Sequence, residues 1–363
     1  MAKVSILLPS LNAREFLEPR VRSLLQQTCP DWEAIVLDSQ SDDGTWEYFE
    51  SVGRTDPRFR LHQIPREGLY AALNRGLQLA GGEFLHIATC DDSMAPDFLA
   101  QMLAAFAQCP EAGIAVCDVR LISRHDDDLS YADLAPHLTR HAANNLLSLD
   151  RVRTAFANEQ PRNLNYRPVP HDCLLHFDGR SLYLSLNQLL IRTKLARSAR
   201  PFKTTIGSVA DFDWLLGLTS STGTVHFPEK LAMWRFHGNQ LSLQRDESRA
   251  TSREVAAKGA LADLDQKHPG LLSANDRAAL LLPLKLESAG EILRVFGWFE
   301  SAIRLGQMLL VRPSATWRAL SRTRLRLGTR RHTLIPMIFQ AIGLEPRDVV
   351  EVRKKKTELA SRA

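Results

Sequence analysis

The stretch Glu83-Phe84-Leu85-His86-Ile87-Ala88-Thr89-Cys90-Asp91-Asp92 joins a short apolar run to two adjacent acidic residues. Such a run predicts a strand that is buried on both faces of a sheet. Open α/β sheets bind ligands beyond the carboxyl ends of their strands, where this pair falls. Two carboxylates this close repel each other unless a cation or hydrogen-bond donors hold them. The pair therefore predicts either a metal-assisted site for a phosphate-bearing substrate or, because residues 93–98 read as a helix start, an acidic helix cap.

Strand and helix patterns alternate along the first third of the chain. Strands are predicted at 4–8, 33–38, 60–64, 83–88 and 114–118, and helices at 13–27, 45–49, 69–80 and 96–107. This alternation predicts a mostly parallel, doubly wound sheet flanked by helices. The pattern loosens over 119–180. It returns with strands at 187–191, 225–227 and 232–237 and with a helix that opens near residue 209.

Composition and cysteine usage indicate a globular protein of a reducing compartment. The chain has 363 residues, of which 44% are hydrophobic and 24% charged, so it has room for one large domain with an appendage or for two domains. Its five cysteines are scattered without paired spacing, which argues against a disulfide framework. The apolar run at the start is too short for a signal peptide, and no run reaches the roughly 18 apolar residues of a spanning helix. We therefore expect a cytoplasmic protein.

Positive charge is concentrated in the last part of the chain. Residues 285–363 contain 16 Lys and Arg but 7 Asp and Glu, a net charge of +9; the whole chain carries +5, so residues 1–284 carry −4. The part that holds the acidic pair is not basic, and we expect no nucleic-acid binding. Residues 246–363 are predicted to form a basic helical extension. Its helices either pack on the rest of the protein or make peripheral contact with an anionic membrane, alternatives that liposome binding with and without the extension would separate.

Further acidic residues lie at other predicted strand ends and turns. Asp38 ends the second strand, Asp42-Asp43-Gly44-Thr45 forms the turn after it, and Asp211 opens a late helix. Asp213 follows two residues later, so at most one of these two side chains faces a common pocket. Transfer from a nucleoside diphosphate needs a cation for the leaving phosphates and a base for the acceptor hydroxyl. The acidic pair suits the first role and Asp211 the second.

Several other motifs are missing or weak. No Gly-x-Gly-x-x-Gly and no Walker-type loop follows the first strand, which argues against a dinucleotide-dependent oxidoreductase and a P-loop enzyme. Pro9-Ser10-Leu11-Asn12 is not the glycine-rich, basic loop that a nucleotidyltransferase needs. The run His171-Asp172-Cys173-Leu174-Leu175-His176 contains metal-ligand types, but without a second set of partners it is weak evidence for zinc, and a core or pocket-wall role is the alternative.

Segments in matching order resemble the family 2 glycosyltransferases of the GT-A fold. The resemblance covers about residues 3–245 and rests on VSILLPSLN (4–12), LLQQT (24–28), DWEAIVLD (31–38), SDDGT (41–45), GLYAALNRG (68–76), AGGEF (80–84), DD (91–92), ADFD (210–213) and WRFH (234–237) with Ser242. It implies a Rossmann-like GT-A fold over residues 1–245, with a mixed, mostly parallel sheet flanked by helices, and a C-terminal helical extension over residues 246–363.

The resemblance also implies a reaction and its site. The reaction is an inverting transfer of a sugar from a nucleotide-diphosphate sugar, a UDP-sugar as first choice, to a glycan or lipid-linked acceptor in surface polysaccharide or glycan assembly. The divalent cofactor is Mn²⁺ or Mg²⁺. The implied site residues are Asp211 as catalytic base, Asp92 and His237 as metal ligands, and Pro9, Leu11, Asn12, Asp38, Arg66, Asn74 and Asp91 for the donor. Asp38 is expected at the nucleotide base and Asp91 at the ribose or pyrophosphate, while His237 is alternatively an ordinary strand-edge residue.

Four positions depart from the family pattern. Ser39 stands where many members carry a second aspartate, so recognition of uracil stays open. Ala210 replaces the glutamate before the base, and Arg66 and Ala71 replace acidic residues of one branch. Arg66 instead suits contact with the donor phosphates. These departures leave an alternative function, a catalytically silent GT-A-fold protein that binds a sugar or a partner, although the retained acidic residues argue against it.

Overall fold

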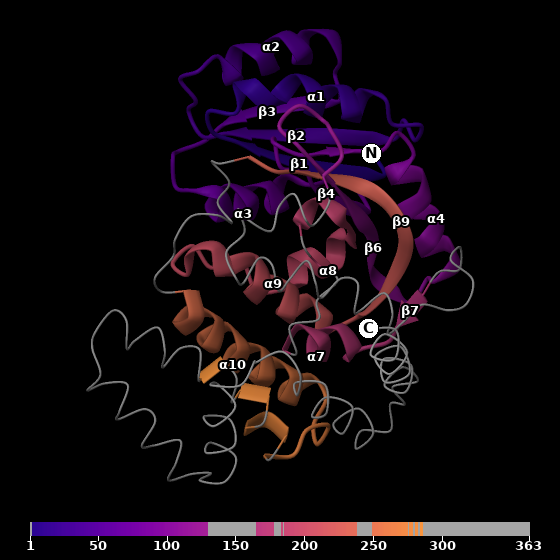
Figure 1. Ribbon diagram of the computed structural model, residues 1–363, viewed down its shortest axis with the longest axis vertical. Helices are drawn as coiled ribbons and strands as arrows, with labels where there is room; N and C mark the ends of the chain where they lie inside the picture. The colour runs from indigo at the N-terminus through magenta and orange to yellow at the C-terminus, as the bar shows by residue number, and fades with distance from the viewer. Residues whose placement is uncertain are drawn as a thin grey trace, which may run out of the picture.

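The computed structural model describes residues 2–129, 165–177, 183, 185–237, 249–274, 276–278, 280–281 and 284–285. In these residues one mixed sheet has the strand order β3-β2-β1-β4-β8-β6-β9-β5, and β7 pairs with β9 (Figure 1). The strands are β1 (Val4–Ser10), β2 (Trp32–Asp38), β3 (Phe59–Gln63), β4 (Phe84–Ile87), β5 (Ser93–Met94), β6 (Ala112–Ile122), β7 (Asn165–Arg167), β8 (Leu189–Arg192) and β9 (Gly223–Arg235).

Parallel pairing fixes the functional edge of the sheet. β1 pairs in parallel with β2 and β4, and β2 pairs in parallel with β3. β8 lies antiparallel between β4 and β6, and β9 runs parallel to β6. The carboxyl ends of β1, β2 and β4 therefore meet at one edge. Asp38 lies at this edge, and the acidic pair follows β4 there, as the sequence predicts.

Helices cover both faces of the sheet. They are α1 (Arg14–Leu25), α2 (Thr45–Thr55), α3 (Leu69–Leu79), α4 (Phe98–Gln108), α7 (His171–Phe177), α8 (Thr193–Ser198), α9 (Ala210–Thr219) and α10 (Arg249–Lys267). Alternate residues of β1 enter opposite clusters: Ile6 and Leu8 pack with α1, α2 and α4, whereas Leu7 packs with α3, α8 and α9. Figure 1 shows α1 and α2 on one side of β1 and β2 and α3 on the other. Burial on both faces explains the continuous apolar runs of these strands.

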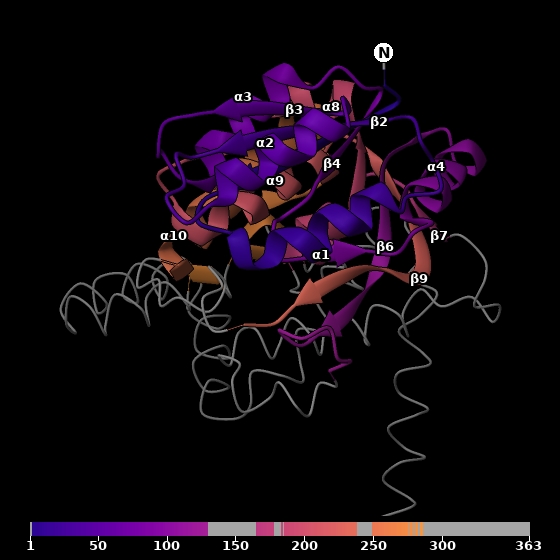
Figure 2. The same ribbon diagram turned by 90° about the horizontal axis from the view of Figure 1, so that it is seen from above.

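Two boundaries differ from the sequence predictions. The helix predicted at 96–107 begins two residues later, at Phe98, and Ser93 and Met94 before it form β5 against Met233 and Ala232. The strands predicted at 225–227 and 232–237 are one strand, β9, whose pairing with β6 shifts register around Asp118. Figure 2 shows β6 and β9 running together toward their carboxyl ends.

The described part of the extension packs on the sheet domain. α10 lies beside α9 (Figure 1), and its Ala257, Ala260 and Leu264 share a hydrophobic cluster with Leu216 of α9 and Cys173 of α7. No helix among the described residues is both long and apolar enough to cross a membrane. The basic residues beyond 285, with their predicted membrane contact, lie outside the described residues.

Gly82 should be sensitive to any side chain. A Cβ at Gly82 would lie 2.7 Å from the main-chain nitrogen of Ser5, whereas at Gly81 it would lie 3.4 Å from Glu33 Oε1. Because the obstacle at Gly82 is main chain of β1, Gly82→Ala should lower the free energy of unfolding by about 1–3 kcal/mol. Gly81→Ala, the matched control, should change it by no more than about 0.5 kcal/mol. Urea denaturation measures both, and equal effects would contradict this account of the β1–β4 approach.

Candidate active site

The loops after β1 and β2 interlock at the carboxyl edge. The Asn12 main-chain nitrogen donates to Ser41 Oγ at 2.9 Å, its Nδ2 donates to Asp42 Oδ1 at 2.9 Å, and the Asp42 nitrogen donates to Asn12 Oδ1 at 3.0 Å. Asn12 and Gln40 both have left-handed backbones, with φ of 49° and 56°. This conformation is uncommon for residues other than glycine, although asparagine adopts it more readily than glutamine, and the hydrogen bonds of the two loops hold it here. The predicted donor loop with Pro9, Leu11 and Asn12 is therefore preformed.

Asp38 is enclosed by the loop that it organises. It is fully buried, and its carboxylate accepts hydrogen bonds from Ser10 Oγ at 3.1 Å, Ser41 Oγ at 2.6 Å and Ser41 N at 3.0 Å. A carboxylate used in this way has no surface for the predicted contact with a nucleotide base in this conformation. Its visible role is to fix the turn after β2.

Arg66 lies over the same turn. Its Nε donates to the carbonyl oxygens of Ser39 at 3.1 Å and Gln40 at 3.0 Å, and its Nη2 donates to Asp42 Oδ2 at 2.9 Å. The hydrogen bond from Arg66 lowers the pKa of Asp42. Arg66 thus lies at the turn that carries Ser39, rather than at the acidic pair.

Asp92 lies beneath the surface at the end of β4. It is 3% exposed, and its Oδ1 accepts from the Arg235 main-chain nitrogen at 2.9 Å. Its Oδ2 accepts from Thr89 Oγ1 at 2.6 Å and from Ser185 Oγ at 3.4 Å. Burial and the neighbouring charge of Asp91 raise the pKa of Asp92 to about 7. Through these hydrogen bonds Asp92 connects the end of β4 to the end of β9.

Asp91 is the member of the pair that lies beside His237. Asp91 Oδ2 and His237 Nε2 are 3.1 Å apart, and 31% of the Asp91 side chain is exposed. Although burial opposes it, the hydrogen bond from His237 and the charges of His237 and Arg20 hold the pKa of Asp91 below its usual value. The His237 ring also packs on Phe16 of α1, with ring centroids 4.7 Å apart. His237, which the sequence predicts as a metal ligand together with Asp92, lies beside Asp91.

The two acids of α9 have different surroundings. Asp213 is 1% exposed and receives Lys203 Nζ at 2.9 Å, with Arg200 Nη2 at 3.7 Å. Asp211, in the first turn, is partly exposed. The two side chains thus differ in exposure, as expected for positions on different helix faces, and Asp211 is the one that reaches the surface.

Asn74 and the segment 171–176 have internal roles. Asn74 exchanges two hydrogen bonds with the main chain of Phe202, at 2.8 and 2.9 Å, and so ties α3 to the segment before α9. Asp172 forms a buried ion pair with Arg167 and accepts from Tyr183 Oη at 2.6 Å. Within the described residues, no group of three or more His, Cys, Asp or Glu side chains is arranged to hold a metal.

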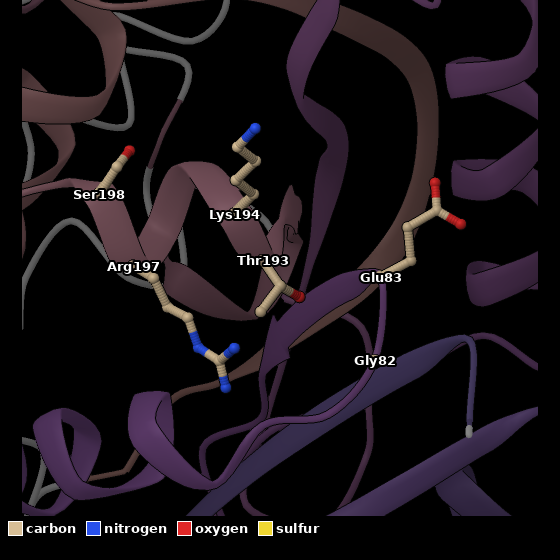
Figure 3. Close-up of a pocket in the computed structure, with 6 residues that line it drawn as sticks. All are labelled: Gly82, Glu83, Thr193, Lys194, Arg197 and Ser198. Carbon is tan, nitrogen blue, oxygen red and sulfur yellow. The ribbon is translucent and has the colours of Figure 1, made fainter.

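A separate depression lies at the opposite edge of the sheet. Its volume is about 500 Å³, and it is lined by Gly82, Glu83, Thr193, Lys194, Arg197 and Ser198 (Figure 3). Gly82 and Glu83 immediately precede β4, whereas the acidic pair follows it. Arg197 is engaged there with the carbonyl oxygen of Leu77 at 2.9 Å. This depression is therefore not part of the candidate site.

The sequence matches a known family over the region just described. Residues 5–177 match the model for glycosyl transferase family 2. These residues belong to glycosyl transferase family 2. The match includes the interlocked loops and the acidic pair, but it ends before Asp211 and His237.

Curated relatives that are named glycosyltransferases match part of the chain. The chain is 34% identical over 101 residues, 28% of its own length and 40% of the relative's, to the putative teichuronic acid biosynthesis glycosyltransferase TuaG of Bacillus subtilis. It is 29% identical over 182 residues, 45% of its length and 64% of the relative's, to a PGL/p-HBAD biosynthesis glycosyltransferase of Mycobacterium bovis. The chain thus spans less than two thirds of either relative.

Solved glycosyltransferase structures share the GT-A fold. S. aureus TarS 1–349 in complex with UDP-GlcNAc gives a TM-score of 0.58 at 14% identity, covering 98% of this chain and 92% of that one. The mannosyltransferase PcManGT from Pyrobaculum calidifontis, in complex with GDP-Man and Mn²⁺, gives 0.50 at 17% identity, covering 94% and 86%. At these identities the likeness establishes the fold, and it confirms the α/β architecture expected from the sequence.

Stability should separate Asp213 from Asp211. Asp213→Asn leaves Lys203 and Arg200 without their buried carboxylate, so it should lower the free energy of unfolding by about 1–3 kcal/mol. Asp211→Asn changes a partly exposed side chain and should stay within about 0.5 kcal/mol of the unsubstituted protein. Urea denaturation measures both. A larger loss for Asp211→Asn would mean that the two residues have been assigned the wrong way round.

Proposed function

We propose that this protein is a glycosyltransferase that moves a sugar from a nucleotide-diphosphate sugar to an acceptor hydroxyl with inversion at the anomeric carbon. The observation that carries the proposal is the juxtaposition of Asp91 and His237 at 3.1 Å, 146 residues apart in sequence, at the carboxyl edge of a family 2 fold. A carboxylate and an imidazole at this edge suit the diphosphate end of a donor.

The residues present fit a divalent cation. Mg²⁺ and Mn²⁺ commonly take one or two protein ligands and complete their shell with phosphate oxygens and water. Asp91 offers a partly exposed carboxylate and His237 a ring nitrogen, whereas both oxygens of Asp92 already accept hydrogen bonds. We infer that the acidic pair and His237 hold the cation. In this proposal the more exposed Asp91 faces the cation and the buried Asp92 supports it, whereas the sequence resemblance implies Asp92 as the ligand and Asp91 at the donor. When bound, the cation supplies positive charge to the leaving diphosphate.

Asp211 is the proposed base. Its carboxylate would take the proton of the acceptor hydroxyl while that oxygen forms a bond to the anomeric carbon. The bond from that carbon to the diphosphate oxygen breaks in the same step, and the nucleoside diphosphate leaves. One displacement inverts the configuration, and the site needs no second nucleophile.

The nucleotide base of the sugar donor is a separate part of the proposal. The fold neighbours are complexed with UDP-GlcNAc in one case and with GDP-Man in the other, so the fold does not select the base. We propose a UDP-sugar, held against the preformed loop with Leu11 and Asn12 and against the turn that Asp38 and Arg66 fix. Half of Leu11 is exposed, which gives an apolar surface for a planar base.

The acceptor follows from the named relatives. Their names assign them to teichuronic acid biosynthesis and to PGL/p-HBAD biosynthesis. We propose an acceptor of the same class, a glycan or a lipid-linked sugar. Membrane contact through the basic residues beyond 285 stays a prediction.

A donor-hydrolysis assay tests the function against the silent alternative. The protein is incubated with Mn²⁺ and with UDP-, GDP- and dTDP-sugars in turn, and release of the nucleoside diphosphate is measured. We expect slow hydrolysis of at least one UDP-sugar, since water replaces a missing acceptor. Donor binding without release from any of them would favour a silent sugar-binding protein.

Asp211→Asn should abolish transfer and spare donor binding. Loss of a general base costs on the order of 10²–10⁴-fold in rate, while the donor site lies on other elements. Initial rates and UDP affinity, measured by calorimetry, check the two parts. Asp97→Asn, which changes an acidic helix cap before α4, is the control and should keep the wild-type rate. A normal rate for Asp211→Asn would remove the assignment.

Removing the cation should remove turnover. Chelation with EDTA should stop donor hydrolysis, and added Mn²⁺ or Mg²⁺ should restore it. Asp91→Asn and Asp92→Asn should each weaken Mn²⁺ binding in the presence of UDP by at least about tenfold, whereas Asp97→Asn should not. Unchanged Mn²⁺ affinity in both pair variants would show that the cation is held elsewhere or is not needed.

A further inference from the structure

Two buried arginines donate hydrogen bonds to the main chain of the turn that carries the acidic pair. Arg20, on α1, is fully buried and donates from Nε to the carbonyl oxygen of Thr89 at 2.8 Å. Arg235, at the end of β9, is 1% exposed and donates from Nε to the carbonyl oxygen of Asp91 at 2.8 Å. The two carbonyl groups lie on either side of Cys90, so the two guanidinium groups hold the turn from two different elements.

Among the described residues, Arg20 forms no hydrogen bond to an acidic side chain. Its second hydrogen bond is a donation from Nη2 to Asn187 Oδ1 at 2.7 Å. A buried cation is costly unless nearby negative charge compensates it. The carboxylates that act on it most strongly are those of Asp92 and Asp91. The negative charge of the acidic pair thus partly offsets the cost of burying Arg20.

Arg235 connects the pair to the loop beyond β6. Its Nη1 donates to the carbonyl oxygens of Ser123 at 3.0 Å and Arg124 at 3.1 Å, and its Nη2 donates to Asp126 Oδ1 at 2.6 Å. Its own main-chain nitrogen donates to Asp92 Oδ1 at 2.9 Å. One residue therefore fixes the carboxylate of Asp92, the carbonyl group of Asp91 and the strand end that carries His237.

We propose that Arg20 and Arg235 are positioning residues that set the cation affinity of the acidic pair, an inference that rests on the proposed function. The guanidinium groups of both arginines are buried behind the acidic pair. Their hydrogen bonds to the carbonyl oxygens of Thr89 and Asp91 fix the turn that places Asp91 beside His237. Arginine is required because its donors stand in a rigid planar fork, whereas the ammonium group of lysine is a point charge on a flexible stem.

The test compares charge-conserving variants. Arg20→Lys and Arg235→Lys keep the positive charge of the side chain but lose the planar guanidinium group. Each should weaken Mn²⁺ binding in the presence of UDP at least tenfold, as measured by calorimetry. Circular dichroism should show that both variants are folded. Arg167→Lys is the matched control, since Arg167 is also buried but pairs with Asp172 instead of the turn. It should lose stability without changing Mn²⁺ affinity by more than about threefold.

The milder variant Asp126→Asn covers the case in which a lysine variant does not fold. Asp126 is exposed and anchors only the outer end of Arg235, so Mn²⁺ affinity should fall a few-fold in a folded protein. Wild-type affinity in Arg20→Lys and Arg235→Lys, or an equal loss in Arg167→Lys, would overturn the positioning role. If the unsubstituted protein itself binds no Mn²⁺ with UDP, the proposed function fails first.

Discussion

The hydrogen bond between the Asp92 carboxylate and the Arg235 main-chain nitrogen joins the first half of the chain to the second. It links residues 143 positions apart at 2.9 Å and is shielded from water, so it is not weakened by competition with solvent. The pairing of β5 with β9 lies directly beside it. His237 follows Arg235 by two residues and lies next to the Asp91 carboxylate. The candidate site therefore depends on where β9 ends, and β9 ends where Asp92 holds it.

The sequence predicts the sheet well where strands are buried on both faces. β1, β2 and β4 contain mostly apolar residues because helices cover both faces of the sheet, and such runs can be recognised without knowledge of the partner strands. β9 is not readable in this way, because Pro228, Glu229 and Lys230 interrupt its pattern. The structure absorbs them in a register shift against β6, where Phe227 pairs with Cys117 and Lys230 with Asp118. β5 has two residues and exists only through its partner, so local sequence carries no signal for it.

The site shows which part of a functional prediction depends on tertiary contacts. Helix geometry alone places Asp211 and Asp213 on different faces of α9. It does not reveal that Asp38 turns inward to Ser10 and Ser41, because a carboxylate at a strand end looks the same whether it accepts internal hydrogen bonds or faces a ligand. Arg20 did carry a signal: it is a charged residue on the apolar face of α1 that also carries Leu17 and Leu24. A lone charge on a buried face indicates a compensating charge elsewhere in the fold.

The helix that carries Asp211 is held along its length by the first helix of the extension. Arg253 of α10 lies over the Phe212 ring, 5.3 Å from its centroid, next to the proposed base. At the other end of α9, Lys267 Nζ donates to Ser220 Oγ at 3.0 Å and to Ser221 Oγ at 2.6 Å. Between them, Arg200 lies against Gly217 and Gly259 and binds Asp263 at 3.0 Å. Because polar contacts at both ends and a shared hydrophobic cluster fix α9 to α10, the placement of Asp211 depends on residues well beyond the family match.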